Sequence, residues 1–415
     1  MIEEETFLNH AIALYRQRES CLQENRVDVV RFLEIEERLR EQLFALSRYR
    51  PFEDGEPEKA ADTFIYLAKR FIQSKTTIKE QAAELACDWL LEPGEKGQGA
   101  CDALMLFPSP QTYHYMKKSY SDLEALRPIL IYILMQQSAS LPDEIIRQAE
   151  LEYQDPLLQA QILYYAANDA STGIDFFIHH YQSLLDRNDT PDKEHAVLLA
   201  AIWGGMVRND PDSFVALRRS IEIESDDMQR LDLLRLAALS GDPEYFNILE
   251  KITEYSPEVG YHFLALLGSQ ASVEKILTGL HHPRTSAHAE DAWWWVTGQE
   301  LPKVARMTVI GEDSDESDQT EDGGSVPDAQ VAEAWWNKNS GKQYDRWLCG
   351  ELFSSTGVCR MLTEYAGMIS NDLLDLLALS HKKPVQIGVY NWHDIRLQQL
   401  GVWFHRSARF RSGGA

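Results

Sequence analysis

The residues best suited to metal or acid–base chemistry are three histidines and two pairs of adjacent carboxylates. His281, His282 and His288 could in principle ligate zinc, because imidazole suits that metal. No cysteine lies near them, however, and two histidines before a proline also fit the C-terminal end of a helix. Asp226-Asp227 and Glu290-Asp291 are typical of solvated helix starts, since an acid–base pair needs burial to separate its two pKa values. We therefore expect no metal, no cofactor and no catalytic residue.

The short motifs of common enzyme classes do not occur in the sequence. Its glycine-rich stretch Pro93–Ala100 lacks the spacing that cradles a phosphate, and no G-x-S-x-G, H-E-x-x-H or EF-hand pattern is present. The five cysteines are scattered without a C-x-x-C pair, which gives no sign of a disulfide framework. Cys349 and Cys359 are expected to be small buried apolar side chains. These observations favour a protein that is not an enzyme.

Two clusters of tryptophan are candidates for contact with another surface. Trp293, Trp294 and Trp295 are consecutive, so on a helix their side chains point about 100° apart and cannot all face one core. At least one should pack on the next helix layer, on the C-terminal unit or on a partner, and pairing with Trp335 and Trp336 is one alternative. Aromatic residues are also frequent in binding hot spots. The candidate partner-binding residues, which include two tyrosines of the helical repeats, are Trp293, Trp294, Trp295, Trp335, Trp336, Tyr245 and Tyr261.

The elements that must position these residues are short amphipathic helices recurring from about Lys75 to about Pro302. Their apolar side chains follow i, i+3, i+4, i+7 spacing, and turns rich in glycine, aspartate and proline separate them. Pro156–Asn168 and Ser286–Thr297 are two such predicted helices, and proline recurs in the first helical turn. Units that cannot bury their own apolar stripe do so by stacking. The pattern therefore predicts a solenoid with repeats of roughly 30 to 37 residues, whose concave face is lined by the second helix of each pair.

The sequence divides into four predicted segments. Residues 1–75 are expected to form an N-terminal helical cap, and residues 76–305 the array of HEAT-like helical repeats. Residues 306–326 are acidic and nearly without apolar side chains, which predicts a disordered linker. Residues 327–415 are expected to form a small C-terminal helical unit. The predicted fold class is all-α, a HEAT-like α-solenoid with an N-terminal cap and a small C-terminal unit.

Net charge limits the kinds of partner. The chain of 415 residues carries a formal charge of −25, while 44% of its residues are hydrophobic. Nucleic acid and anionic membranes are disfavoured as partners, because both need an excess of lysine and arginine. The N-terminus lacks the pattern of a secretory signal, and no apolar run is long enough to span a bilayer. We expect a cytoplasmic protein that binds a basic protein partner.

Three stretches are informative when they are taken together. They are HAIALYRQRESCL followed by LEIEERLREQLFAL, then LTGLHHPRTSAHAEDAWWWVTGQELP, and finally AEAWWNKNSGKQYDRWLCGELFSSTGVCRML with DIRLQQL downstream. In this order and spacing they resemble one uncharacterised bacterial family of HEAT-repeat-like proteins, often encoded among type VI secretion accessory and effector genes. Where that family tends to have an arginine-rich stretch, this chain has Ile369–Asp372, so no function of those arginines is carried over.

The resemblance implies a fold and a genetic setting, and two roles fit that setting. One is an adaptor or chaperone that holds a type VI secretion effector before loading, and the other is an immunity protein that neutralises such an effector. The alternative from a different class is an enzyme, because some HEAT-like folds act as lyases on bilin chromophores. Fold similarity alone is a weak basis for that alternative. The sequence therefore favours a protein-interaction scaffold that is not an enzyme.

Overall fold

The computed structural model describes residues 2–49, 56–92, 94–151, 155–187, 194–305, 325–342 and 344–412. Within these ranges the chain is mostly helical, and its only sheets are three pairs of strands two or three residues long. It folds as two compact units. The first unit contains Met1–Ala216 and Cys359–Ala415, and the second unit contains Leu217–Val358.

The first unit takes its helices from both ends of the chain, and one pair of short strands joins these ends. Strand β1 (Val27–Asp28) pairs antiparallel with β6 (Tyr365–Ala366). The helices are α1 (Ile2–Gln23), α2 (Val29–Ser47), α3 (Ala60–Phe71), α4 (Thr76–Trp89), α5 (Glu95–Leu106), α6 (Pro110–Asp122), α7 (Arg127–Gln136), α8 (Asp143–Ile146), α9 (Pro156–Asn168), α10 (Asp175–Arg187), α11 (His195–Val207), α20 (Ile369–His381) and α21 (His393–Ser412).

The second unit contains the later helices of the array and two strand pairs, β2 (Lys303–Ala305) with β3 (Ser325–Pro327) and β4 (Trp347–Leu348) with β5 (Glu351–Leu352). Its helices are α13 (Asp227–Ser240), the short 3₁₀ turn η3 (Pro243–Tyr245), α14 (Phe246–Tyr255), α15 (Pro257–Leu267), α16 (Gln270–Leu280), α17 (Ser286–Thr297) and α18 (Ala329–Asn339). Two helices cross the boundary between the units, α12 (Pro211–Ile223) and α19 (Ser355–Glu364).

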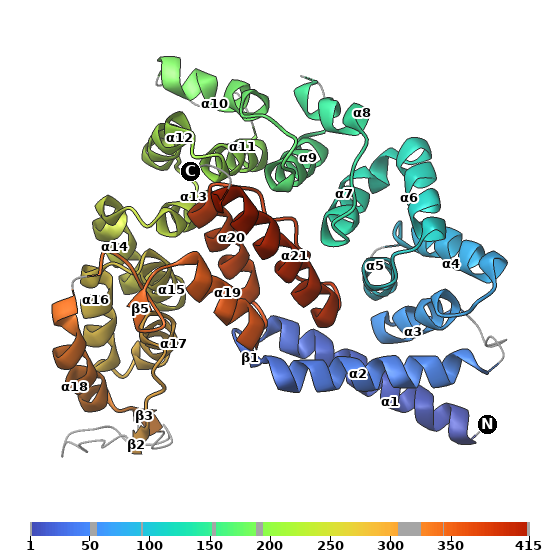
Figure 1. Ribbon diagram of the computed structural model, residues 1–415, viewed down its shortest axis with the longest axis horizontal. Coiled ribbons are helices and arrows are strands. Elements are labelled where there is room, and N and C mark those ends of the chain that lie inside the picture. Colours follow the sequence, from blue (N-terminus) through green and yellow to red (C-terminus); the bar gives the residue numbers. More distant parts are fainter. Residues whose placement is uncertain are drawn as a thin grey trace, which may run out of the picture. The chain divides into compact units, whose positions relative to one another are not determined.

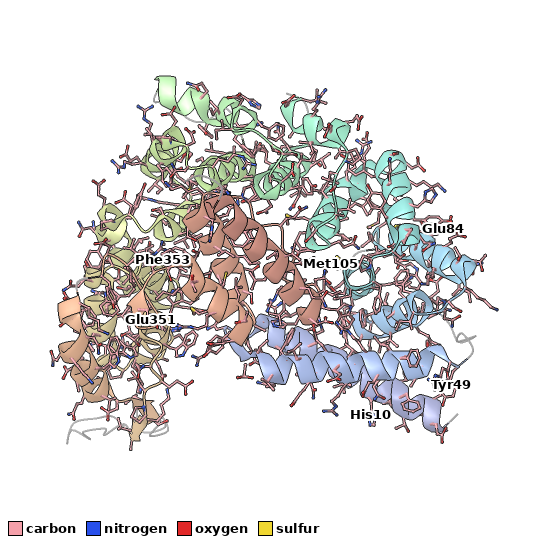
Figure 2. All side chains as sticks on the ribbon, viewed as in Figure 1. His10, Tyr49, Glu84, Met105, Glu351 and Phe353 are labelled. Carbon is pink, nitrogen blue, oxygen red and sulfur yellow. The ribbon has the colours of Figure 1, made fainter. Side chains whose placement is uncertain are left out.

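The helices stack in two layers, which confirms the predicted all-α solenoid-like fold. In the first unit α3, α5, α7, α9 and α11 pack on one another in succession, while α4 packs on α6 in the other layer. In the second unit α13, α15 and α17 form the corresponding succession. Helix α11 of this layer, HAVLLAAIWGGMV, is apolar on almost all sides, because neighbouring helices cover it. Figure 2 shows Met105 of α5 inside the first unit and Glu84 of α4 at its outer margin.

Proline and glycine mark the helix ends, as the sequence pattern predicts. Asp155 caps α9 with its side chain, and Pro156 occupies the first helical position. Gly241, Gly268 and Gly298 close α13, α15 and α17 in the left-handed conformation, which glycine adopts without the steric cost of a Cβ. Helices α9 and α17 begin and end at the predicted residues.

The concave side of the first unit is occupied by the chain itself. Helices α20 and α21 lie inside the arc of α1 to α11 (Figure 1), with α20 against α11 and α21 against α2. Between them, the Trp392 indole donates to the carbonyl oxygen of Leu106 in α5 at 2.8 Å. Tyr390 packs on Tyr132 of α7, with ring centroids 6.4 Å apart. The expectation that second helices line the concave face is therefore wrong in this unit, since the first helix of each pair faces inward.

In the second unit, residues 346–350 cross the C-terminal ends of three helices. The guanidinium of Arg346, a partly buried residue, donates to carbonyl oxygens of Leu239 in α13 and Leu266 in α15, at 3.1 and 2.5 Å. The next backbone N–H groups donate to the carbonyl after α15 at 2.7 Å and to one in α17 at 3.0 Å. Burial lowers the pKa of Arg346 to about 9. These bonds place the ends of α13, α15 and α17 side by side, so the three helices run parallel.

The boundaries of the compact units differ from those of the four predicted segments. Residues 327–358 pack with the second unit, whereas residues 359–415 belong to the first unit. Residues 1–75 likewise pack with the helices that follow them. Of the predicted linker 306–326, residues 306–324 lie outside the described residues, and Ser325 and Val326 belong to strand β3.

Replacing Gly260 by alanine should destabilise the second unit. A Cβ at Gly260 of α15 would lie 2.4 Å from the backbone nitrogen of Thr253 in α14, so a helix backbone must move. We expect Gly260→Ala to lower the free energy of unfolding by about 1–3 kcal/mol in urea denaturation followed by circular dichroism. The matched control is Gly341→Ala, because no heavy atom lies within 4 Å of the new Cβ at that position. Equal stabilities of the two variants would contradict the close approach of α14 and α15.

Candidate functional site

The tryptophans selected from the sequence are packed inside the second unit. Trp293, Trp294 and Trp295 are only 0%, 8% and 5% exposed. The rings of Trp293 and Trp335 meet edge to face with centroids 5.6 Å apart, and Trp336 lies 5.4 Å from the ring of Trp347. The two tryptophan clusters therefore pack against each other, which is one of the alternatives drawn from the sequence.

All three faces of α17 that carry tryptophan are covered by the protein itself. While Trp293 contacts Trp335 of α18, Trp295 lies 6.2 Å from the ring of His262 in α15. Helix α17 packs on α15, α16 and β4, so three consecutive indoles can each be buried against a different neighbour. Helix geometry predicted these different directions. Trp335 is partly exposed, and Trp336 is 6% exposed.

The two candidate tyrosines are also core residues, which corrects their proposed role as partner contacts. Tyr261 is 3% exposed, and its ring covers Gly279 so closely that a Cβ there would lie 2.3 Å from the phenolic oxygen. Tyr245 is 7% exposed and forms a hydrogen bond with Arg218, which raises the pKa of that arginine. Residues with so little exposed surface cannot anchor a partner without unfolding the layer, so a docking surface must be sought elsewhere.

A cluster of buried charged residues lies at the centre of the first unit. We call Arg18, Glu36, Asp102, His393 and Arg396 the polar centre; each is at most 4% exposed. Arg18 of α1 donates from Nε to Glu36 of α2 at 2.9 Å and from Nη2 to the carbonyl oxygen of Tyr390 at 2.8 Å. The second carboxylate oxygen of Glu36 accepts from the backbone N–H of His393 at 2.7 Å. Glu36 therefore neutralises Arg18 and also caps the first turn of α21.

His393 and Arg396 extend this cluster along α21. The Arg396 guanidinium donates to Nδ1 of His393 at 2.5 Å and to the hydroxyl of Ser370 in α20 at 3.0 Å. Burial, followed by the charge of Arg396, lowers the pKa of His393 to about 3, so its imidazole is neutral. Burial also lowers the pKa of Arg396 to about 10. At the outer margin, Asp394 forms a two-pronged ion pair with Arg40 of α2 at 2.9 and 2.5 Å.

Asp102 is an acidic group of the polar centre whose pKa is raised by its surroundings. The hydroxyl of Tyr15 donates to Oδ2 at 2.5 Å, and the Gln98 amide donates to Oδ1 at 2.9 Å. Burial, with repulsion from Glu19, raises the pKa of Asp102 to about 7 despite these hydrogen bonds. A shifted carboxyl group is a common mark of a functional site, but it is also found in buried structural networks.

The polar centre joins several elements of the first unit, and most of its donors meet protein acceptors; among the described residues, Nε of Arg396 and Nε2 of His393 are buried without a hydrogen-bond partner. Its contacts link α1, α2 and α5 to the segment before α21 and to α21 itself. A buried network with this degree of pairing selects one arrangement of the elements that carry it. Sequence analysis missed this cluster. The available signal was a charge inside an apolar stripe, as at Glu36 in FLEIEERL and at Asp102 in ACDALML.

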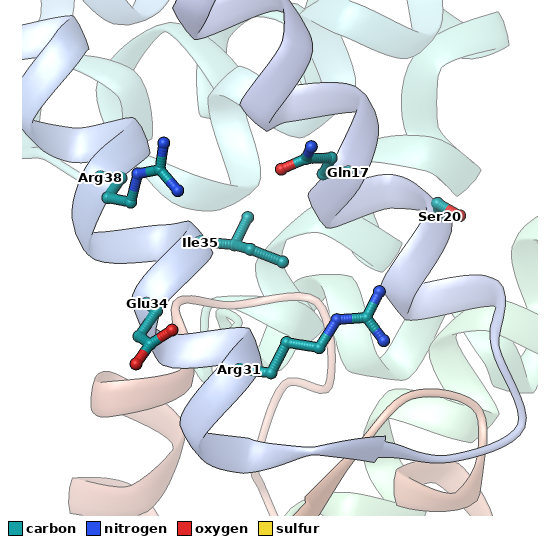
Figure 3. A pocket seen from close by; sticks show the side chains of 6 residues that line it. All are labelled: Gln17, Ser20, Arg31, Glu34, Ile35 and Arg38. Atoms are coloured by element: carbon teal, nitrogen blue, oxygen red, sulfur yellow. The ribbon is translucent and has the colours of Figure 1, made fainter.

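A shallow hollow of about 290 Å³ lies between α1 and α2, on the surface of the first unit. Figure 3 shows Gln17 and Ser20 from α1 facing Arg31 and Arg38 from α2, with Ile35 between them. Arg31 forms an exposed ion pair with Glu24 at 3.5 Å. The lining is polar and open to solvent, and none of the residues of the polar centre lines it. The hollow can accept a small polar group, but it offers no enclosed reaction space.

In comparisons with known proteins, no family model, no curated protein and no solved structure matches the chain. In the part of the chain that the structure describes, no three metal-ligating side chains come together to hold an ion. No helix among the described residues is both long and apolar enough to cross a membrane. The resemblance to HEAT-repeat-like proteins of type VI secretion gene clusters stays a prediction from the sequence.

Replacing Asp102 by asparagine should change how stability depends on pH. Since the pKa of Asp102 is about 7 in the fold and about 3.9 in the unfolded chain, the folded form binds more protons between these values. Wild-type stability should therefore fall, relative to Asp102→Asn, as pH rises from about 5 to about 8. The expected change is about 2–3 kcal/mol in the free energy of unfolding, measured by urea denaturation across that range.

Asp394→Asn is the matched control for this pH series. The hydrogen bonds from Arg40 lower the pKa of Asp394, so its stabilising contribution is lost only as pH falls through that lowered value. The effect of Asp394→Asn on stability should be constant between about pH 5 and about pH 8. An Asp102→Asn effect that is equally constant would show that Asp102 is not protonated by burial in the fold.

Proposed function

We propose that the protein is a scaffold that binds a basic protein partner. The observation that carries this proposal is a set of large apolar side chains exposed on a strongly acidic chain. Met228 is 73% exposed, Tyr255 70% and Val30 60%, and the formal net charge is −25. Apolar contact supplies affinity in protein interfaces, while surrounding charge selects the partner and speeds the encounter.

The stacked helices support this proposal by their geometry. A stack buries the inner layer and leaves the outer helices and the helix ends as a long surface that is suited to macromolecules. In the first unit the concave side is already filled by α20 and α21, so a partner has the outer layer and the edges available to it. The titratable groups with strongly shifted pKa values, such as Asp102 and His393, belong to the enclosed polar centre rather than to these surfaces.

The biological role we propose follows the resemblance drawn from the sequence. A basic effector of a type VI secretion system is the partner we propose, and the protein would act on it as an adaptor or chaperone, or as an immunity protein. Both roles require tight and selective binding of one protein without chemical change. Binding of this kind is what an acidic helical stack with exposed apolar side chains can provide.

Association with the partner should be fast and should slow as salt rises. Affinity capture with the full-length chain, followed by mass spectrometry, would identify partners in cells that encode it. The association rate of each purified partner is then measured at ionic strengths of about 0.01 M and about 0.15 M, where the Debye length is about 30 and 8 Å. We expect the rate constant to fall at least about tenfold between them.

Two outcomes would overturn the proposed function. An association rate that does not change with ionic strength would remove electrostatic attraction as the basis of partner choice. Turnover of a small molecule by the purified protein at a useful rate would replace a scaffold by an enzyme. A purified acidic protein of similar size serves as the control partner, and its association should become faster rather than slower as salt rises.

A further inference from the structure

We infer that one edge of the second unit docks a basic amphipathic helix. This edge, the acidic edge, carries three exposed apolar residues and six carboxylates: Ile223, Met228 and Tyr255 with Glu222, Glu224, Asp226, Asp227, Glu254 and Glu258. The inference rests on the proposed function and specifies which surface binds and what chemistry the partner presents there.

The parallel course of α13 and α15 brings these residues to one edge. Arg346 binds carbonyl oxygens at the C-terminal ends of both helices, and the helices pack on each other. Their first residues, Asp227 and Pro257, must therefore both lie at the opposite edge, about 16–21 Å away along the helix axes. Met228 is the second residue of α13, and Tyr255 lies two residues before the start of α15, so each lies close to one of two helix starts whose axes are about 8–10 Å apart.

The apolar residues of the acidic edge are exposed to an unusual degree for their size. Met228 and Tyr255 are 73% and 70% exposed, and Ile223 is 38% exposed. Leu249 and Ile252 of the same α14 helix are at most 1% exposed, so Tyr255 lies outside the stripe that packs α14 into its layer. Methionine adapts to irregular apolar surfaces, and tyrosine is enriched in binding hot spots.

Three of the carboxylates have an explanation within the fold. Asp226 is the N-cap of α13 and accepts from the backbone N–H of Gln229 at 2.9 Å. Asp227 lies in the first turn of α13, and Glu258 lies in the first turn of α15. Negative charge at a helix N-terminus is favourable, because the backbone N–H groups there carry partial positive charge.

Glu224 accepts from the backbone N–H of Asp226 at 2.9 Å, whereas the other two carboxylates, Glu222 and Glu254, are placed where helix stability disfavours them. Glu222 lies in the last turn of α12 and Glu254 in the last turn of α14, and neither turn contains a basic residue. The backbone carbonyls of a helix C-terminus repel a carboxylate. Neither side chain forms an ion pair within the described part of the chain. Three nearby basic residues, Arg219, Arg230 and Lys251, only partly offset the charge of the six carboxylates. These glutamates are therefore explained better by an external cation.

The partner that fits this surface is a helix with apolar side chains on one face and lysine or arginine beside them. Anchors at i, i+4 and i+7 on such a helix span about 10 Å, which is close to the spacing of about 8–10 Å between the axes of packed helices. Flanking basic residues would then meet the carboxylates on both sides of the apolar contact. Nucleic acid and anionic membranes present the wrong charge to this surface.

A synthetic amphipathic peptide tests the inference directly. The probe consists of leucine at positions i, i+3, i+4 and i+7 with lysine elsewhere, and the control peptide has glutamate in place of lysine. Binding to the full-length chain is followed by fluorescence anisotropy at low ionic strength. We expect the lysine peptide to bind and Met228→Ser/Tyr255→Ser to weaken that binding about tenfold or more, since both anchors are removed. Leu352→Ser is the matched apolar control, because Leu352 is 52% exposed elsewhere in the second unit.

A second pair of variants separates binding from stability. Glu222→Gln/Glu254→Gln should weaken binding of the lysine peptide several-fold, yet leave the thermal midpoint unchanged or higher, because two unfavourable charges are removed from helix C-termini. Glu5→Gln/Glu84→Gln changes the net charge by the same amount at exposed positions of the first unit, and it should alter binding little at physiological salt. A purely structural role for Glu222 and Glu254 predicts instead a lower midpoint with unchanged binding.

The outcomes distinguish this inference from the function on which it rests. If the anchor variants and Leu352→Ser bind the lysine peptide equally well, the acidic edge is not the docking surface. The scaffold function then still stands wherever a captured partner associates in a salt-dependent manner. Binding of the glutamate peptide as tightly as the lysine peptide would overturn the assigned partner chemistry. Loss of salt dependence with every captured partner would overturn the scaffold function itself.

Discussion

The structure depends on how the carbonyl groups at the ends of its stacked helices find hydrogen-bond donors. A helix leaves its last four carbonyls without partners inside the helix, and a stack buries many of them. In the second unit, Arg346 and the backbone after it supply donors to three neighbouring helices. In the first unit, the Trp392 indole donates to α5, and Arg208 spans the end of α9 with bonds to Ala166 and Asp169. Each of these donors bonds to the ends of particular helices, so it fixes the position of those helices along their axes relative to one another.

Charged side chains are paired with opposite charges inside the protein, whereas on its surface carboxylates lie together with few basic residues. In the polar centre, Arg18 meets Glu36, and Asp394 meets Arg40 beside it. Pairing there offsets the large cost of removing charges from water. Along the acidic edge, carboxylates are gathered with only partial compensation, and their repulsion is tolerated because they stay in water. The first arrangement fixes one fold, and the second leaves attraction available for another molecule.

Sequence reasoning predicted the features that depend on local chemistry. Proline and glycine fixed the ends of α9 and α17 at the expected residues, and helix geometry predicted three different directions for Trp293, Trp294 and Trp295. It did not predict the polar centre, because Glu36 and His393 are 357 positions apart and nothing in either local sequence specifies the other. For the same reason, the sequence did not predict where α20 and α21 pack. Their apolar stripes show that they must be covered, but not that the concave side of the first unit covers them.

The contacts of Arg18 also set the order in which the two units can be completed during synthesis. Arg18 lies near the start of the chain, and the carbonyl oxygen to which it donates, that of Tyr390, lies 372 positions later. The second unit is continuous in sequence, so all of its residues have left the ribosome while the first unit still lacks α20 and α21. Until these helices arrive, the concave side of α1 to α11 is uncovered, and its apolar surface is open to mispairing. The part of the protein that is translated first is therefore the part that is finished last, and it is the part for which a folding chaperone has the longest time to act.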